Sequence, residues 1–216
     1  MKHIKSIALA ASTAAALMLG SGIASANNVV TVNTVQIFGT VDPAKINDYT
    51  EYMAGVNLYE ALTTLDGSGA IQPLLSESWS TSADGLTWTF KLKKGATFQD
   101  GSPIEAKDVV WSVNRLLAIN EGPSYLFEGV LSEGSVTEID SSTVQFKLEK
   151  TYAPFLTTTP ILFVVNSDLA KENAGDGDPW AQDYIANNSI GAGAFYLDSW
   201  ERGAGMTIKA YEGYHL

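Results

Sequence analysis

The 216-residue sequence contains no cysteine and only two histidines, His3 and His215. Without cysteine the fold cannot be held by disulfides, so its stability must come from burying apolar side chains. The same shortage leaves no Ser-His-Asp or Cys-His set for nucleophilic catalysis and no His-rich zinc site. A hydrolase that works with two carboxylates needs neither residue type, so the composition leaves this class of enzyme open.

Basic residues are also scarce, with 13 Lys and Arg against 24 Asp and Glu, for a formal net charge of −11. Nucleic-acid-binding domains need clusters of Lys and Arg, and the sequence has no such cluster, so we expect no nucleic-acid partner. The acidic balance says little about a ligand, since net charge mainly affects solubility.

After the amino terminus, no apolar run reaches the roughly 18 residues that a membrane-spanning helix requires. The first 26 residues instead have the three parts of a secretory signal. Lys2 and Lys5 form its positive region, and the apolar region runs from Ile7 to Gly20. The small residues Ala24-Ser25-Ala26 then predict cleavage after Ala26.

A transmembrane anchor is the alternative, but Ser12 and Thr13 interrupt the short apolar run, which favours cleavage. Losing Lys2 and Lys5 changes the formal charge from −11 to −13. The lipid anchor of a bacterial lipoprotein requires a cysteine directly after the cleavage site, and this sequence has none. These features predict an unanchored periplasmic protein of a bacterium with two membranes.

The segment 74–115 is the most regular part of the chain. Its Asp84-Gly85 pair is typical of a hairpin turn between two Trp-bearing strands. The residues from Leu86 to Lys93 alternate strictly between apolar and polar, as in a half-buried strand. A second turn at Asp100-Gly101 leads into a helical apolar stripe that begins at Val109. The segment therefore predicts a hairpin followed by an amphipathic helix.

The start of this helix has two interpretations. Ser102 and Glu105 fit a capping box with Pro103 at the first helical position. A later start near Ala106, with Ile104 still extended, fits the apolar stripe equally well. The polar residues of the segment are explained by turns, caps and a solvated strand face, so none of them indicates catalysis.

Taken in order, the segment is also specific as a sequence. It carries P-x-L-x-E-x-W, then D-G-x-x-W-x-F-x-L-x-K-G, then F-x-D-G-x-P-I-x-A-x-D-V-V-x-S-x-N-R. This order resembles the signature of the extracellular solute-binding proteins of bacterial ABC importers, in the oligopeptide- and dipeptide-binding family (family 5). The matches include Glu77, Trp79, Asp84, Gly85, Trp88, Phe90, Asp100, Gly101, Pro103, Ala106, Asp108, Ser112, Asn114 and Arg115.

The resemblance implies an α/β fold of the type II periplasmic-binding-protein kind, with mixed sheets and helices. It implies that residues 27–59 and 167–216 form part of the main lobe and that 60–166 form a smaller α+β subdomain inserted in it. The chain is much shorter than the family's usual members, so the interpretation is an amino-terminal fragment without the second lobe. On its own, such a fragment is expected to bind a ligand weakly or not at all.

Five candidate ligand-binding residues follow from the resemblance, not from the spacing of the residues. Asn47, Asp48 and Tyr49 lie just beyond Asp42-Pro43, where the family places a segment along its cleft; a plain surface loop is the alternative. Tyr125 lies near a cleft-facing aromatic of the family, one residue out of step; buried packing is its alternative. Thr159 matches a cleft-facing position but reads equally well as a hydroxyl at a helix end.

The remaining elements are predicted from local pattern. We expect buried strands at 29–38 and 161–166, a helix at 52–65 and a polar loop at 171–183. Glu60 in that helix is read as a cap partner or a solvated charge. Further expectations are a hairpin at 136–148, a helix opened by the A-P-F-L element at 153–156, and strands at 190–197 and 207–211, with glycines that allow close backbone approach.

The resemblance implies a non-enzymatic protein that binds a solute, first of all a peptide, and delivers it to the permease of an ABC importer. It implies no cofactor and a monomer. The family also carries metal chelates, haem and saccharides, so these cargoes stay open beside the peptide. An exported carboxylate-dependent hydrolase and a periplasmic holdase are the competing classes.

Overall fold

The computed structural model describes residues 29–33 and 39–216, so the predicted signal segment and its cleavage after Ala26 lie outside the described residues. Residues 29–33 belong to a unit separate from the rest of the chain and form no strand. Their valines are 63–84% exposed. β-branched residues favour a strand where neighbours pack around them, and these valines have no such packing. The predicted strand at 29–38 is therefore wrong for 29–33, and 34–38 lie outside the described residues.

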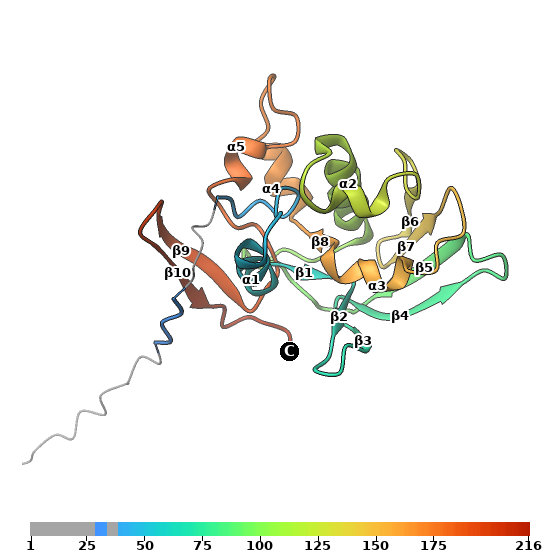
Figure 1. The fold of residues 1–216 in the computed structure, drawn as a ribbon, viewed down its shortest axis with the longest axis horizontal. Helices are drawn as coiled ribbons and strands as arrows, with labels where there is room; N and C mark the ends of the chain where they lie inside the picture. Colours follow the sequence, from blue (N-terminus) through green and yellow to red (C-terminus); the bar gives the residue numbers. More distant parts are fainter. Residues whose placement is uncertain (1–28, 34–38) are drawn as a thin grey trace, which may run out of the picture. The chain divides into compact units, whose positions relative to one another are not determined.

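Helices and short strands alternate along residues 39–216 (Figure 1). The helices are α1 (Tyr49–Leu58), α2 (Ala106–Ile119), α3 (Phe155–Thr158), α4 (Ser167–Glu172) and α5 (Gln182–Ile185), with 3-10 helices η1 (Gly122–Phe127) and η2 (Thr159–Ile161). The strands are β1 (Glu60–Ala61), β2 (Thr63–Leu65), β3 (Ile71–Pro73), β4 (Ser76–Thr81), β5 (Thr87–Leu92), β6 (Val136–Asp140), β7 (Thr143–Lys147), β8 (Phe163–Val164), β9 (Phe195–Glu201) and β10 (Gly205–Ala210).

The largest sheet has four antiparallel strands in the order β4-β5-β7-β6. Both hairpins predicted from the sequence are present in it. In the first turn Gly85 has a φ of 71°, a conformation that glycine adopts without steric cost, and the Asp84 carboxylate accepts the amide of Leu86. The two central strands, β5 and β7, alternate apolar and polar residues with a period of two, which gives the sheet one apolar face.

The apolar face of this sheet packs against α2, which contacts β6 and β7 (Figure 1). Together they form a first hydrophobic cluster that includes Phe90, Phe146, Val109, Val113 and Leu116, all buried. Burying each such side chain contributes about 1.5–3 kcal/mol. The helix starts at Ala106, so the later of the two predicted starts is correct and Ser102 is not its cap. Instead the Asp108 carboxylate accepts the amide of Glu105, the residue that precedes the first turn.

The predicted helix at 52–65 is wrong at both ends, because α1 covers Tyr49–Leu58 and is followed by β1 and β2. Asp48 caps its start by accepting the amide of Glu51. The chain then turns extended at Tyr59 and pairs Glu60 with Val164 of β8. Pairing with a distant strand overrides local helix propensity here.

A second hydrophobic cluster contains Leu58, Tyr59, Val165, Ala170 and Ile185 and joins α1 to the segments around α4 and α5. Trp111, on α2, also packs against it, so α2 lies between the two clusters.

The glycines before β9 allow the close backbone approach that the sequence predicted, and the segment that they approach is the end of α1. A Cβ on Gly193 would lie 2.2 Å from the Asn57 carbonyl oxygen, and one on Gly191 would lie 2.2 Å from that of Leu58. Only glycine allows the backbones to approach this closely.

The later strands are present with shifted bounds. The strand predicted at 161–166 is reduced to β8, although residues 162–166 are buried as expected. The strands predicted at 190–197 and 207–211 occur as β9 and β10. The polar loop predicted at 171–183 is shorter, because α4 extends to Glu172 and α5 begins at Gln182. Within the described residues, no helix has the length and apolar character needed to cross a bilayer.

Candidate functional site

The three predicted ligand residues that follow Asp42-Pro43 lie at the start of α1. Asn47 and Tyr49 are exposed, Tyr49 to 76%. Asp48 is occupied structurally, because its carboxylate caps α1. The backbone amide of Asn47 is also occupied, since it donates to Glu51 Oε2 at 3.0 Å. The side chains of Asn47 and Tyr49 therefore remain the groups that this segment presents outward.

Tyr125 lies on η1 and is 71% exposed, which rules out the alternative of buried packing. The start of η1 abuts the loop before α1. A Cβ on Gly122 would meet the carbonyl oxygens of Ala44 and Ile46 within 2.8 Å. The 3-10 helix that carries Tyr125 therefore lies, in space, beside the loop that leads to residues 47–49.

Thr159 is fully buried, and its hydroxyl is used inside the fold. It donates to the Leu156 carbonyl at 2.8 Å, so the 2.5 Å contact with Thr63 Oγ1 is one in which Thr63 donates. This geometry fits the helix-end role. A contact between Thr159 and a ligand stays a prediction, and this placement does not favour it.

Three residues that match the family signature, but to which the sequence interpretation gave no role, form a buried polar stripe along α2. Asp108, Ser112 and Arg115 recur at the i, i+4, i+7 spacing of one helix face, next to the apolar stripe of the first cluster. Each is at most 8% exposed, and each bonds a different segment. Ser112 Oγ, in the middle, accepts the Val165 amide at 3.0 Å.

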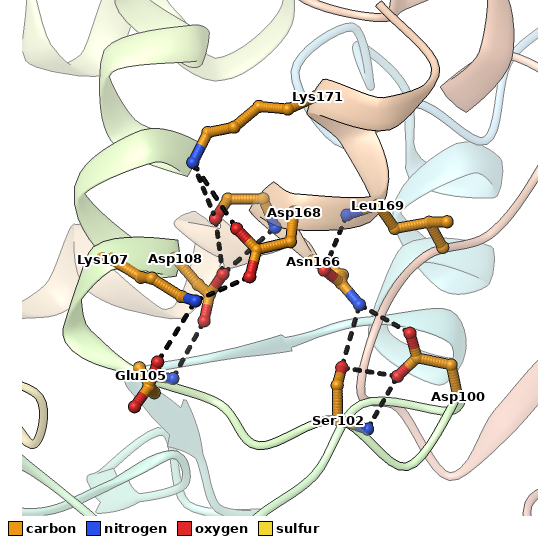
Figure 2. Close-up of polar contacts among 10 residues, drawn as sticks. Asp100, Ser102, Glu105, Lys107, Asp108, Asn166, Asp168, Leu169 and Lys171 are labelled. Carbon is orange, nitrogen blue, oxygen red and sulfur yellow. Dashed lines mark hydrogen bonds and ion pairs between the residues drawn. The ribbon is translucent and has the colours of Figure 1, made fainter.

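At one end of the stripe, Asp108 fastens α2 to α4 (Figure 2). Its Oδ1 accepts the Ser167 hydroxyl at 2.7 Å and the Ser167 amide at 3.1 Å. Burial raises the pKa of Asp108, and the bonds from Ser167 and from the Glu105 amide offset part of that rise.

Asn166 makes the second connection in Figure 2. Its Oδ1 caps α4 by accepting the Leu169 amide, and its Nδ2 donates to Asp100 Oδ2 at 2.8 Å and to Ser102 Oγ at 3.0 Å. The turn at Asp100-Gly101 is thereby fixed to α4. Lys107 adds an exposed ion pair to Asp168 at 2.6 Å.

At the other end of the stripe, Arg115 reaches the Asp42-Pro43 turn. Its Nη1 and Nη2 donate to Asp42 Oδ1 and Oδ2, both at 2.6 Å, and its Nε donates to the Trp180 carbonyl. Both side chains are at most 2% exposed. Such a two-pronged pair is among the strong charge-assisted hydrogen bonds.

Glu60 is a further buried carboxylate, so its interpretation as a cap partner or a solvated charge is wrong. It is 2% exposed and accepts the Tyr214 hydroxyl at 2.5 Å, while His215 Nε2 lies 2.6 Å from its other oxygen. Burial and the bond to Glu60 both raise the pKa of Tyr214. Only contacts between residues more than 150 positions apart reveal this cluster, so no local pattern could predict it.

Two hollows lie outside the predicted ligand segment. A small hollow of about 20 Å³ beside Ser112 and Arg115 has room for one water molecule. A surface hollow of about 400 Å³ lies between the β9–β10 hairpin and residues 184–190. None of the five predicted ligand residues lines either hollow.

Comparison with known families identifies the class of protein that this fold and signature define. The model of the bacterial extracellular solute-binding proteins, family 5, matches residues 70–215. The chain belongs to this family, as its sequence signature indicated. The α/β fold of the type II binding-protein kind is likewise confirmed, although every strand pair named above is antiparallel.

Three similar proteins show how much of the family's length this chain covers. The chain is 34% identical over 176 residues to the probable D,D-dipeptide-binding periplasmic protein DdpA of Escherichia coli, matching 78% of this chain and 33% of the relative. It superposes with a TM-score of 0.74, at 25% identity, on the substrate-binding domain of an oligopeptide ABC transporter from Bacillus anthracis, covering 85% of this chain and 38% of that one. NikZ of Campylobacter jejuni, solved with Ni(L-His), gives 0.72 at 25% identity, covering 84% and 35%. The chain thus spans about a third of the length of these relatives.

Proposed function

We propose that this protein binds a peptide in the periplasm and passes it to the permease of an ABC importer without chemical change. The observation that carries the proposal is membership in the family over residues 70–215. Both the dipeptide-binding relative and the oligopeptide transporter domain named above point to a peptide rather than to another solute.

The ligand would lie along the start of α1, where Asn47 and Tyr49 are exposed. Support for including Tyr125 is that it is exposed on η1, whose first residue lies against the loop before α1. Because the Asn47 amide is held by Glu51, contacts from this residue would come from its side-chain amide and its carbonyl. Tyr49 and Tyr125 offer broad faces with one hydroxyl each, which suits peptides of varied sequence.

The lobe division expected from the sequence fits the two hydrophobic clusters. The first cluster falls almost entirely within 60–166, and most of the second comes from the flanking segments. We propose that these parts form one lobe, since the polar stripe of α2 fastens them together. A ligand would favour the closed state of the protein by contacting this lobe and an opposing one, and the permease would recognise the closed, monomeric form.

A metal chelate is the second candidate, favoured by the nickel–histidine complex bound to NikZ. Both cargoes predict binding without turnover, and a hydrolase predicts turnover. Native mass spectrometry of the protein purified from the periplasm of its host separates these cases. A retained mass that denaturation releases as intact peptide supports the proposal. Release of a nickel chelate would make the chelate, and not a peptide, the proposed cargo. Cleavage of an added peptide would contradict the proposal that the protein binds its ligand without changing it chemically.

A further inference from the structure

The Arg115–Asp42 pair is unusual because it buries two oppositely charged side chains where α2 contacts the loop before α1. Both carboxylate oxygens of Asp42 are bound by the guanidinium, which lies 5.9 Å from the centre of the Trp111 ring. The Trp180 ring packs in turn against Trp111. Removing two charges from water costs free energy that their attraction only partly offsets, so such a pair is weak support for stability. Its geometry instead fixes the place of one segment relative to another.

The segment that it fixes is the loop leading to α1. Besides Arg115, the Asp42 carboxylate accepts the Ala44 amide at 2.9 Å, and the Asp42 carbonyl accepts the Lys45 amide. The guanidinium therefore holds the turn at residues 42–45, which is separated from Asn47 by one buried residue, Ile46.

Glu51 closes the base of the same loop. It is 5% exposed, and its two carboxylate oxygens accept the amides of Gly39 and Asn47, each at 3.0 Å. Two buried carboxylates thus hold the segment 39–48 from both sides, and its outward end is the predicted ligand segment 47–49. The side chains of Val41, Ala44 and Ile46 in this segment are buried as well. Apolar packing therefore anchors the loop, while the two carboxylates fix the positions of its backbone amides.

We propose that Arg115 is a positioning residue, which acts through Asp42 to hold the segment 47–49 in its ligand-binding conformation before the ligand arrives. This inference rests on the proposed function, since it assigns that segment to the site. A preordered loop loses less conformational entropy on binding, so the pair increases affinity without touching the ligand.

The test compares the full-length wild-type protein, which includes the opposing lobe, with its double variant Arg115→Met/Asp42→Leu, both purified from the periplasm. Replacing both charges with apolar side chains is often neutral for stability, so the variant is expected to fold. We expect it to retain an equimolar library of di- to pentapeptides about tenfold more weakly in native mass spectrometry, the cost of ordering one or two side chains. The backbone amides of Gly39 and Asn47, which donate to Glu51 and not to Asp42, should exchange hydrogen faster, a change that a merely structural pair in another segment would not produce.

Arg115→Lys is the second variant, for use if the double variant does not fold. It keeps the charge but lacks the planar fork, so it should show the same two effects in weaker form. Ser167→Ala is the matched control. It removes a buried hydrogen bond at the other end of the same stripe and should leave peptide retention within about twofold of wild type, as for a site that shares no partners.

A folded variant that retains peptides as wild type does, or whose 39–49 amides exchange at the wild-type rate, would overturn the inference. If the wild type itself retains no peptide, the proposed function fails instead. The exchange measurement then still decides whether Arg115 orders the loop.

Discussion

At the scale of single residues, the buried carboxylates of this chain have different partners and therefore different consequences. Asp42 faces a guanidinium, Asp108 faces hydroxyl and amide donors, and Glu60 faces a tyrosine and a histidine. A carboxylate with a full countercharge depends on that charge. One with only neutral donors retains part of its desolvation cost.

Removing only one member of the Arg115–Asp42 pair should destabilise the fold strongly. Arg115→Met leaves the Asp42 carboxylate buried without its countercharge, which costs about 3–5 kcal/mol. Urea unfolding of residues 27–216 measures this. Lys107→Met is the control, because its ion pair is exposed and is expected to contribute about 0–1 kcal/mol. Equal losses in the two variants would show that the buried pair has no special role.

Asp108 should make stability depend on pH in the acid range. Its pKa is raised in the folded state, so the folded protein holds this proton more tightly than the unfolded chain does. The stabilisation of the folded state that comes from protonated Asp108 is fully present below the unfolded pKa of 3.8. It is lost as pH rises through the folded pKa.

The free energy of unfolding of wild type, minus that of Asp108→Asn, should therefore increase as the pH falls from neutral toward 3.8. Chemical denaturation of both proteins at several pH values measures the difference, and carboxyls common to both cancel. A difference that is flat or that decreases toward acid pH would show that the hydrogen bonds from Ser167 outweigh burial.

At the scale of elements, the sequence predicted the hairpins and α2 because their signals are local. The alternation of Leu86–Lys93 and the Asp84-Gly85 turn each lie within a few residues. The end of α1 and the start of β1 could not be predicted in this way, because Glu60 becomes a strand residue only by pairing with Val164.

The candidate site was only half accessible to the same reasoning. The resemblance led to Asn47, Tyr49 and Tyr125, which the structure places at the surface in neighbouring segments. The polar stripe of α2 was missed, because polar residues beside an apolar stripe are typical of a solvated helix face. Only the packing of a second cluster against α2 turns that face inward.

The contact between Gly193 and α1 gives a prediction for one element against another. Gly193→Ala would place a methyl group 2.2 Å from the Asn57 carbonyl oxygen, so the β9 segment or α1 must shift. Overpacking of this kind costs about 1–3 kcal/mol, to be measured by thermal or urea unfolding.

Gly177→Ala is the matched control, since no atom lies within 4 Å of the position that its Cβ would take. It should change stability by less than about 0.5 kcal/mol. If both variants unfold together with wild type, the close approach of β9 to α1 is wrong.

At the scale of the whole molecule, we propose that residues 39–216 present one wall of a ligand site. Pockets that hold small ligands bury about 70–90% of the ligand's surface, which one wall cannot do. The matched part of this chain corresponds to 33% of the length of the dipeptide-binding relative and 38% of that of the oligopeptide transporter domain.

Residues 27–216 alone should therefore bind peptides weakly, with a dissociation constant of about 1 mM or above, equivalent to about 4 kcal/mol or less. Isothermal calorimetry with di- and tripeptides measures this, and circular dichroism confirms that the chain is folded. Micromolar binding by these residues would show that one wall is sufficient.

The central claim is that the protein binds a peptide and leaves it unchanged. The most direct measurement titrates the full-length protein, with its opposing lobe, purified from the periplasm. It uses a defined peptide library in a calorimeter and then analyses the recovered peptides by mass. We predict a saturable heat and peptides recovered intact. Cleaved peptides, or saturation by a nickel chelate with no response to any peptide, would contradict the claim.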